Sequence, residues 1–169
     1  MSPPRPGDER AERLLADHLA AFSGASAPVP VLDIAEDLLG LRVHVRPGLD
    51  VSGMLVPSRR VVYLNADEPP ARRRFTLAHE LGHWVVHCAG ASVPPRILCR
   101  SDETTGAADA REREANVFAA TLLMPRAGLT AAVAEGATPD DLARAYDVSG
   151  VAMAWRLYNL GLGPEPSRG

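Results

Sequence analysis

The segment His79-Glu80-Leu81-Gly82-His83 constrains the fold of this chain more than any other. Residues four apart on a helix project from the same face, so both imidazoles can reach one point in space. The residues around them are mostly apolar and predict a largely buried helix: Phe75, Leu77, Ala78, Leu81, Trp84, Val85 and Val86. Burying a polar side chain without a partner costs roughly 2 kcal/mol or more. The fold must therefore supply partners for both histidines and the glutamate, and a metal ion is the simplest partner they could share.

The spacing of these residues is the HExxH pattern of catalytic zinc sites. Zinc accepts histidine nitrogens, and its catalytic sites combine three protein ligands with an open position for water. Glu80 lies beside that position, where a carboxylate can take a proton from water and pass it to a leaving amine. A short pattern also arises by chance, but Gly82 supports the zinc site. A glycine inside a helix costs about 1 kcal/mol relative to alanine, and the close approach of another backbone would explain it.

A third protein ligand is expected on the helix predicted over residues 110–124. The inward face of that helix is marked by Ala115, Phe118 and Leu122. Glu114 borders this face, whereas Glu112, two positions earlier, is expected to point elsewhere. Glu114 is therefore the predicted third ligand. In the alternative interpretation, both glutamates are solvated surface charges.

The rest of the chain predicts helices at both ends and strands between them. Apolar residues at helical spacing favour helices over residues 8–22, 31–39, 71–88, 110–124, 139–146 and 149–160. Alternating or β-rich segments favour strands over residues 41–46, 52–57 and 60–64, and residues 89–108 are expected to form a loop. This order predicts a single α+β domain with a small, mainly antiparallel sheet.

Several separated blocks of the sequence resemble the ImmA/IrrE family of metallo-endopeptidases. The strongest are Arg-Arg-Phe-Thr-Leu-Ala-His-Glu-Leu-Gly-His at residues 73–83 and Glu-Arg-Glu-Ala-Asn-Val-Phe-Ala-Ala-Thr-Leu-Leu-Met-Pro at residues 112–125. Residues 61–65, 142–149 and 156–162 are also similar to this family and follow in the same order. The resemblance implies a zincin-like (gluzincin) helical core that carries HExxH. By position, it also implies that His79, His83 and Glu114 are the zinc ligands and that Glu80 is the general base.

The resemblance also implies a function. Members of the family are similar in cleaving helix-turn-helix transcriptional repressors, so the expected activity is that of a zinc-dependent endopeptidase (a hydrolase) that relieves repression. The expected partner is thus a protein substrate of that class. The chain divides into residues 1–28, a flexible leader and N-terminal helix, residues 29–162, the zinc metallopeptidase domain, and residues 163–169, a disordered tail.

Three further residues are candidates for the second shell or cleft of the site. His87 lies one turn beyond His83 and could line the cleft or orient a ligand, although a structural role is the alternative. Asn116 could hydrogen-bond a ligand or face solvent. Tyr63 lies on a predicted edge strand and could stabilise the oxyanion or pack in the core. The same strand could pair with an extended substrate.

The charge of the chain argues against a nucleic-acid partner. The formal net charge is −3 and the pI about 5.9, so no global basic field attracts nucleic acid. Residues 138–160 have the rhythm of a helix-turn-helix, but between Ser149 and Leu160 only Arg156 is basic. This helix pair is therefore expected to be a packing element of the peptidase. The alternative functions are a non-catalytic antirepressor or DNA/protein-binding module that uses the pair, and a catalytically idle zinc-stabilised domain.

Cysteine usage and hydropathy indicate a cytoplasmic protein with no membrane partner. Cys88 and Cys99 are too few for a disulfide scaffold and fit a reducing compartment. They are interpreted as free thiols, with a redox-sensitive pair as the alternative. No signal peptide is visible, and no apolar stretch approaches the roughly 20 residues that span a bilayer.

Overall fold

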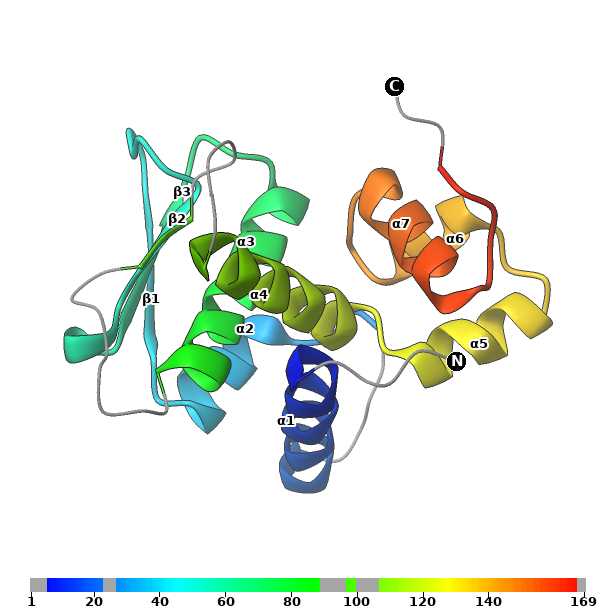
Figure 1. The fold of residues 1–169 in the computed structure, drawn as a ribbon, viewed down its shortest axis with the longest axis horizontal. Helices are drawn as coiled ribbons and strands as arrows, with labels where there is room; N and C mark the ends of the chain where they lie inside the picture. The colour runs from blue at the N-terminus through cyan, green and yellow to red at the C-terminus, as the bar shows by residue number, and fades with distance from the viewer. Residues whose placement is uncertain (1–5, 23–26, 89–96, 100–106, 167–169) are drawn as a thin grey trace.

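A computed structural model describes residues 6–22, 27–88, 97–99 and 107–166 of the chain. The ends of the predicted leader and tail, residues 1–5 and 167–169, lie outside the described residues. Figure 1 shows a sheet at one end of the molecule, long helices beside it and a group of C-terminal helices at the other end. The predicted α+β class is confirmed.

The sheet has the strand order β1-β3-β2-β4 in the described residues. β1 (Arg42–Arg46) runs parallel to β3 (Val61–Asn65), whereas β2 (Gly53–Val56) is antiparallel to both β3 and β4 (Ile97–Cys99). Two of the three pairings are thus antiparallel, as the sequence predicts. The parallel pair arises because the chain crosses from β1 to β2 before it returns in β3 between them.

The sheet corrects the sequence prediction in two places. β4 lies within residues 89–108, which were expected to form a loop; a strand of three residues leaves no readable alternation. β3 is paired on both sides, with β1 and with β2, so the strand of Tyr63 is not an edge strand. Its backbone groups are therefore not free to pair with a substrate.

The helices follow the predicted order, with one addition. Their bounds are α1 (Pro6–Phe22), α2 (Val31–Asp33), α3 (Pro70–Gly82), α4 (Ala107–Leu123), α5 (Arg126–Ala134), α6 (Pro139–Ala145) and α7 (Gly150–Leu160). Shorter or wider turns are η1 (Ile34–Leu38), η2 (Pro57–Arg59) and η3 (His83–His87). α5, which begins directly after Pro125, is not among the predicted helices.

α3 and the first residue of η3 carry the HExxH segment. α3 begins at a proline and ends at a glycine. Pro70 occupies the first helical position, where no backbone N–H is needed. From His83 onward the helix widens into the π-helical turn η3, in which the Cys88 N–H donates to the His83 carbonyl at 3.1 Å. A β-carbon on Gly82 would lie 3.0 Å from Ala115 Cα and 3.1 Å from its carbonyl oxygen. Gly82 therefore permits the close backbone approach that its position predicted.

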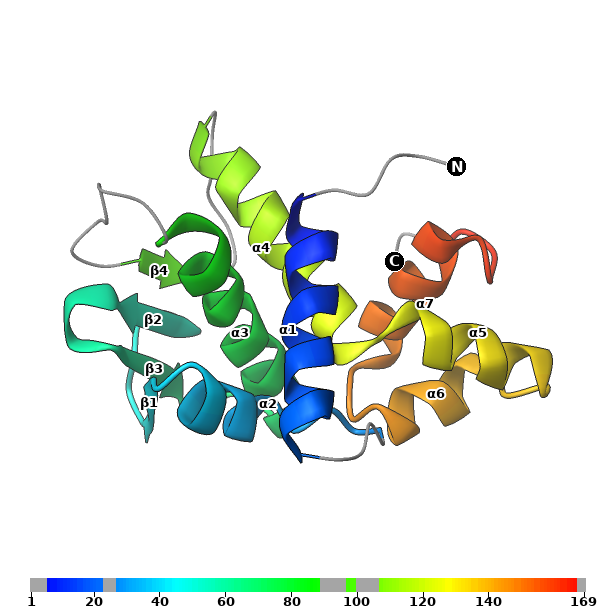
Figure 2. The same ribbon diagram turned by 90° about the horizontal axis from the view of Figure 1, so that it is seen from below.

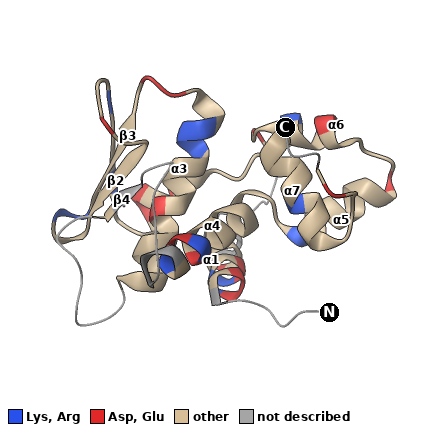
Figure 3. Ribbon diagram, turned by 45° about the horizontal axis from the view of Figure 1, so that its top comes forward, with Lys and Arg blue, Asp and Glu red and all other residues tan. Residues whose placement is uncertain are grey.

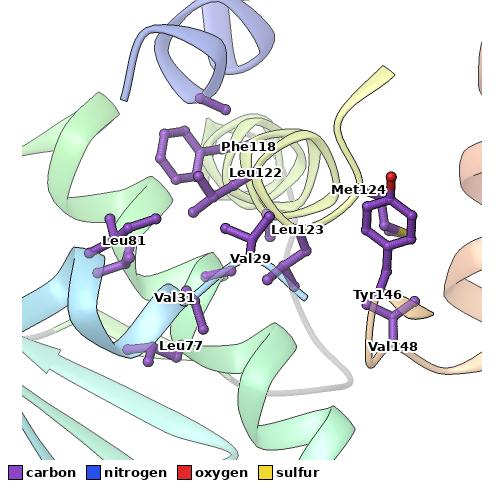
Figure 4. Close-up of a cluster of buried hydrophobic side chains, with 14 of the residues drawn as sticks. Val29, Val31, Leu77, Leu81, Phe118, Leu122, Leu123, Met124, Tyr146 and Val148 are labelled. Atoms are coloured by element: carbon purple, nitrogen blue, oxygen red, sulfur yellow. The ribbon is translucent and has the colours of Figure 1, made fainter. Parts of the chain in front are cut away.

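The core lies between the sheet, α3 and α4, and continues to the C-terminal helices. Figure 4 shows Leu77 and Leu81 of α3 near Phe118, Leu122 and Leu123 of α4. Fully burying one such side chain contributes roughly 1.5–3 kcal/mol. Figure 2 shows α1 crossing α4, and its apolar face belongs to the same core. One contiguous core thus fixes α3 against α4.

The C-terminal helices are capped and tied to the end of α4. Thr138 and Asp141 form a capping box at α6, and Ser149 caps α7. Arg156 of α7 is 8% exposed and donates to the Met124 carbonyl at 3.1 Å. The one basic residue of α7 therefore faces inward rather than toward a partner.

Figure 3 shows both signs of charge spread over the molecule, with arginines gathered at the start of α3.

Among the described residues, no single helix has both the length and the apolar character that crossing a membrane requires. One bent pair, Ala110–Leu123 with Arg126–Ala134 at 52°, meets the criterion by length and composition only.

Candidate metal centre

Three side chains from α3, η3 and α4 converge on one point. The Nε2 atom of His79 lies 3.0 Å from Glu112 Oε2, and the Nε2 atom of His83 lies 3.1 Å from Glu112 Oε1. The two Nε2 atoms are 3.0 Å apart. One ligand atom from each residue lies within 4.8 Å of the other two, so these three side chains could hold one metal ion.

The third member of this cluster corrects the sequence prediction. Glu112, and not Glu114, lies with the two histidines. Glu112 was expected to point elsewhere, but it precedes the buried residues Ala115 and Ala119 by three and seven positions. Residues at these spacings share one face of a helix, so Glu112 continues the inward face of α4. Counting back by whole turns from Ala119 would have found it.

Glu114 lies on the adjoining side of α4 and meets a different histidine. Its Oε2 atom is 2.9 Å from Nε2 of His87. The Nδ1 atom of His87 is in turn 3.1 Å from Nδ1 of His83. His87 therefore contacts a member of the cluster, and its role in orienting that residue stays a prediction.

Asn116 accounts for the remaining nitrogen of His79. Its Oδ1 atom lies 2.9 Å from Nδ1 of His79. Because an amide oxygen only accepts hydrogen bonds, the Nδ1 atom of His79 donates to Asn116, and its Nε2 atom is left to face the cluster. Asn116 is exposed as well, so it contacts both His79 and solvent.

Glu80 is fully buried beside this cluster and has no hydrogen-bond partner for either carboxylate oxygen in the described part of the chain. A β-carbon on Gly53 of β2 would lie 3.1 Å from Glu80 Oε1 and 2.5 Å from Thr76 Cγ2. The absence of a side chain at Gly53 thus makes room for the carboxylate, a contact that the sequence did not signal. Buried carboxylates without partners are costly and are concentrated at functional sites.

The charges of the site are set by burial and by the neighbouring ligands. Burial, together with the negative charge of Glu112, raises the pKa of Glu80 well above its ordinary value. Burial alone would raise the pKa of Glu112, but hydrogen bonds from His79 and His83 outweigh it and lower that pKa to about 2. Burial lowers the pKa of His83, against the opposing effect of its hydrogen bond to Glu112. An ionised carboxylate and a neutral imidazole are the states that bind a metal.

The other predicted residues do not join this site. Val62 and Leu64 face the core, so Tyr63 lies on the opposite face of the sheet, with its ring 5.6 Å from that of His44. It is therefore not directed at the metal centre. Cys88 has a free, half-buried thiol whose pKa is raised by burial. The side chain of Cys99 lies outside the described residues.

Comparison with known families settles what kind of domain carries this geometry. Residues 36–158 match the model of a peptidase family described as the IrrE N-terminal-like domain. The chain belongs to this family. The match includes His79, Glu80, His83 and Glu112, so the IrrE-like domain contains the whole candidate metal centre.

Two relatives place the IrrE-like domain among larger proteins. It is 32% identical over 130 residues to the radiation response metalloprotease IrrE of Deinococcus radiodurans, which covers 69% of this chain and 34% of that protein. It also resembles a solved Mycobacterium tuberculosis transcriptional regulator, with a TM-score of 0.65 and 19% identity over 91% of this chain and 47% of the other. At that identity the second match shows the fold alone. The chain thus spans about a third to a half of the length of these relatives.

Proposed function

We propose that this chain is a zinc-dependent endopeptidase in which His79, His83 and Glu112 hold the metal. The observation that carries the proposal is the convergence of two imidazole nitrogens and a carboxylate beside a buried glutamate without a partner. Two nitrogens and one oxygen are a donor set that zinc accepts, and three protein ligands leave a position open. The IrrE relative, a metalloprotease by name, supports the same activity.

The residues of this chain divide the work of peptide hydrolysis between them. When bound, zinc supplies the positive charge that polarises the scissile carbonyl and acidifies water. Glu80 accepts a proton from the attacking water and donates it to the nitrogen of the departing amine. Asn116 holds the ring of His79 so that its Nε2 atom faces the site.

We further propose that the substrate is a helix-turn-helix transcriptional repressor, met in the cytoplasm, and that its cleavage relieves repression. The support for this substrate is the resemblance of residues 73–83 and 112–125 to ImmA/IrrE peptidases. The alternative function, DNA binding through α6 and α7, is disfavoured because Arg156 is buried against Met124. An intact Glu80 next to the cluster disfavours a catalytically idle domain.

The test compares the wild-type chain with Glu80→Gln and His79→Ala. Metal analysis should find one equivalent of zinc in the wild type and in Glu80→Gln, and little in His79→Ala. Only the wild type should cleave a purified helix-turn-helix repressor encoded beside the gene for this chain. Zinc-free wild type, or normal cleavage by Glu80→Gln, would show that the proposed mechanism is wrong.

A further inference from the structure

The N-terminal helix α1 contacts both of the segments that carry the later candidate ligands. It lies across α4, which holds Glu112, as Figure 2 shows. It also contacts η3, which begins at His83. The model of the peptidase family matches residues 36–158, so α1 lies outside the matched region. A helix that the family match does not include thus touches two ligand-bearing segments.

Arg10 of α1 makes a polar contact with the end of η3. Its Nη1 atom donates to the Val85 carbonyl oxygen at 2.6 Å and to that of Val86 at 3.4 Å. The last four carbonyls of a helix have no amide donor within the helix, and η3 ends at His87. A positive side chain at this end also interacts favourably with the helix dipole. Arg10 therefore caps η3 from a different helix.

The capped turn is the one that begins at His83. The Cys88 N–H donates to the His83 carbonyl at 3.1 Å and to the Trp84 carbonyl at 3.3 Å, and these bonds close the turn. Helices fray from their ends, so fraying at this end removes the bond to the His83 carbonyl first. A ligand side chain has to be held within about 0.5 Å of its productive position. The cap therefore bears on how firmly the backbone holds His83.

The start of α1 is fixed on α4, so the position of Arg10 is fixed as well. A β-carbon on Gly7 would lie 2.7 Å from the Glu114 carbonyl oxygen, which means that the two backbones meet closely. One turn of helix contains both this contact and Arg10. The Oγ1 atom of Thr121 donates to Asp8 Oδ1 at 2.6 Å and adds a second tie between the helices. A single short segment of α1 thus connects α4 with the end of η3.

We propose that α1 is a clamp on the metal centre and that Arg10 is a positioning residue for His83. The inference rests on the proposed zinc site, which it deepens by naming what holds one ligand-bearing turn against the helix of another ligand. Arg10→Ala should weaken zinc binding by roughly 3- to 10-fold, as expected for a charged hydrogen bond at an exposed helix end. Arg10→Lys should retain part of the affinity, because an ammonium group also donates to carbonyl oxygens.

The first test measures amide hydrogen exchange in the metal-free full-length chain, independently of zinc and of catalysis. Residue-resolved exchange reports local opening, and the Cys88 amide reports the bond to His83. Arg10→Ala should speed exchange at this amide by roughly 3- to 10-fold and leave the amides in the middle of α4 unchanged. Arg13→Ala is the matched control, since Arg13 is an exposed arginine on the same helix. It should match the wild type.

The second test measures zinc affinity of the same variants by competition with a chelator. Arg10→Ala should bind zinc more weakly than Arg13→Ala, with Arg10→Lys between them. Equal zinc affinity of the two alanine variants would overturn the proposal. Faster exchange spread evenly over α3 and α4 would overturn it as well, because that result indicates a less stable fold rather than a loosened turn. If wild type bound no zinc, the peptidase proposal would fall, whereas exchange at Cys88 would still decide whether Arg10 holds the turn of His83.

Discussion

At the scale of single residues, the site depends on an absent side chain as much as on the charged ones. Gly53 lies under the carboxylate of Glu80, and a β-carbon there would meet Thr76 Cγ2 at 2.5 Å and Glu80 Oε1 at 3.1 Å. Glu80 and Thr76 both belong to α3, which packs on β2. The position of the proposed general base is thus set by backbone that the HExxH pattern does not include.

Gly53→Ala should therefore displace Glu80 and reduce kcat by roughly 100-fold, the cost of an ångström-scale misplacement. Zinc stoichiometry should stay at the wild-type value because the three atoms nearest to a β-carbon at Gly53 belong to Thr76, Glu80 and Tyr63 and not to a candidate ligand. Steady-state kinetics and metal analysis measure the two quantities. Gly150→Ala is the matched control, since a β-carbon at Gly150 meets nothing within 4 Å. Equal kcat for Gly53→Ala and the wild type would contradict this role.

The raised pKa of Glu80 predicts how the stability of the metal-free protein depends on pH. Above the ordinary carboxyl pKa of 4.5, the unfolded chain has lost a proton that folded Glu80 retains. The free energy of unfolding of the wild type should therefore fall as pH rises above 4.5, relative to Glu80→Gln, by at most about 1.4 kcal/mol per pH unit. Glu112, with a pKa of about 2, titrates below this window.

Urea denaturation of both metal-free proteins between pH 5 and 8 measures this difference, and the other titrating groups are common to both. Glu80→Gln should gain stability over the wild type with increasing pH. A difference that stays constant across the range would mean that Glu80 has an ordinary pKa in the folded protein.

At the scale of elements, the crossing of α3 and α4 holds the candidate ligands together. His79 and His83 come from α3 and its continuation η3, and Glu112 comes from α4. The distance between the two histidines and the glutamate therefore depends on the distance between these helices. Gly82 sets that distance, because a β-carbon there would lie 3.0 Å from Ala115 Cα. The contact is between backbones, which cannot move aside as a side chain can.

Gly82→Ala should lower the free energy of unfolding by roughly 1–3 kcal/mol, the usual cost of overpacking, and should weaken zinc binding. Helix propensity alone predicts the opposite sign, a gain of about 1 kcal/mol. Urea denaturation and zinc titration, with Gly150→Ala as the control, separate the two effects. A more stable Gly82→Ala variant with unchanged zinc affinity would show that the helices do not need this close approach.

The elements also show what the sequence could and could not predict. Long periodic segments were predictable: the helix expected over residues 71–88 is observed as Pro70–Gly82 continued by His83–His87. β4 was not predicted because a strand of three residues has no readable alternation. α5 was not predicted either; it begins directly after Pro125, close to the end of the helix predicted over residues 110–124. That β3 lies between β1 and β2 depends on long-range pairing, which local pattern does not contain.

Within the site, the prediction of the metal ligands depended on helical spacing as much as on the HExxH pattern. His79, Glu80 and His83 were predictable from local sequence and lie together as expected. The choice between Glu112 and Glu114 depended on a rotation of α4 of only two residues. Counting turns from Ala119 gives the observed orientation, whereas counting from Phe118 gave the wrong one.

At the scale of the whole molecule, α5 to α7 pack at the end of α4 away from the sheet (Figure 1). Arg156 joins this group to the rest of the protein through the Met124 carbonyl and lies 4.0 Å from Asp8 of α1. The one basic side chain of α7 is thus used inside the protein, which fits a packing role for the helix-turn-helix-like pair.

Arg156→Ala should consequently lower the free energy of unfolding by about 1.5–3 kcal/mol, the range for hydrogen bonds of charged groups. Arg144→Ala is the control, because the ion pair of Arg144 with Asp141 lies at the surface, with side chains 74% and 52% exposed. It should change stability far less than Arg156→Ala does, because a solvated ion pair contributes little. Similar losses for both variants in urea denaturation would argue against the tie between α7 and α4.

The location of the metal tests the central claim most directly. Crystals of the zinc-loaded chain, measured on both sides of the zinc absorption edge, give an anomalous difference map that shows zinc alone. The account predicts a single strong peak bounded by Nε2 of His79, Nε2 of His83 and the carboxylate of Glu112, with Glu114 hydrogen-bonded to His87 and off the metal. A peak coordinated by Glu114, or the absence of any peak at the two histidines, would contradict it.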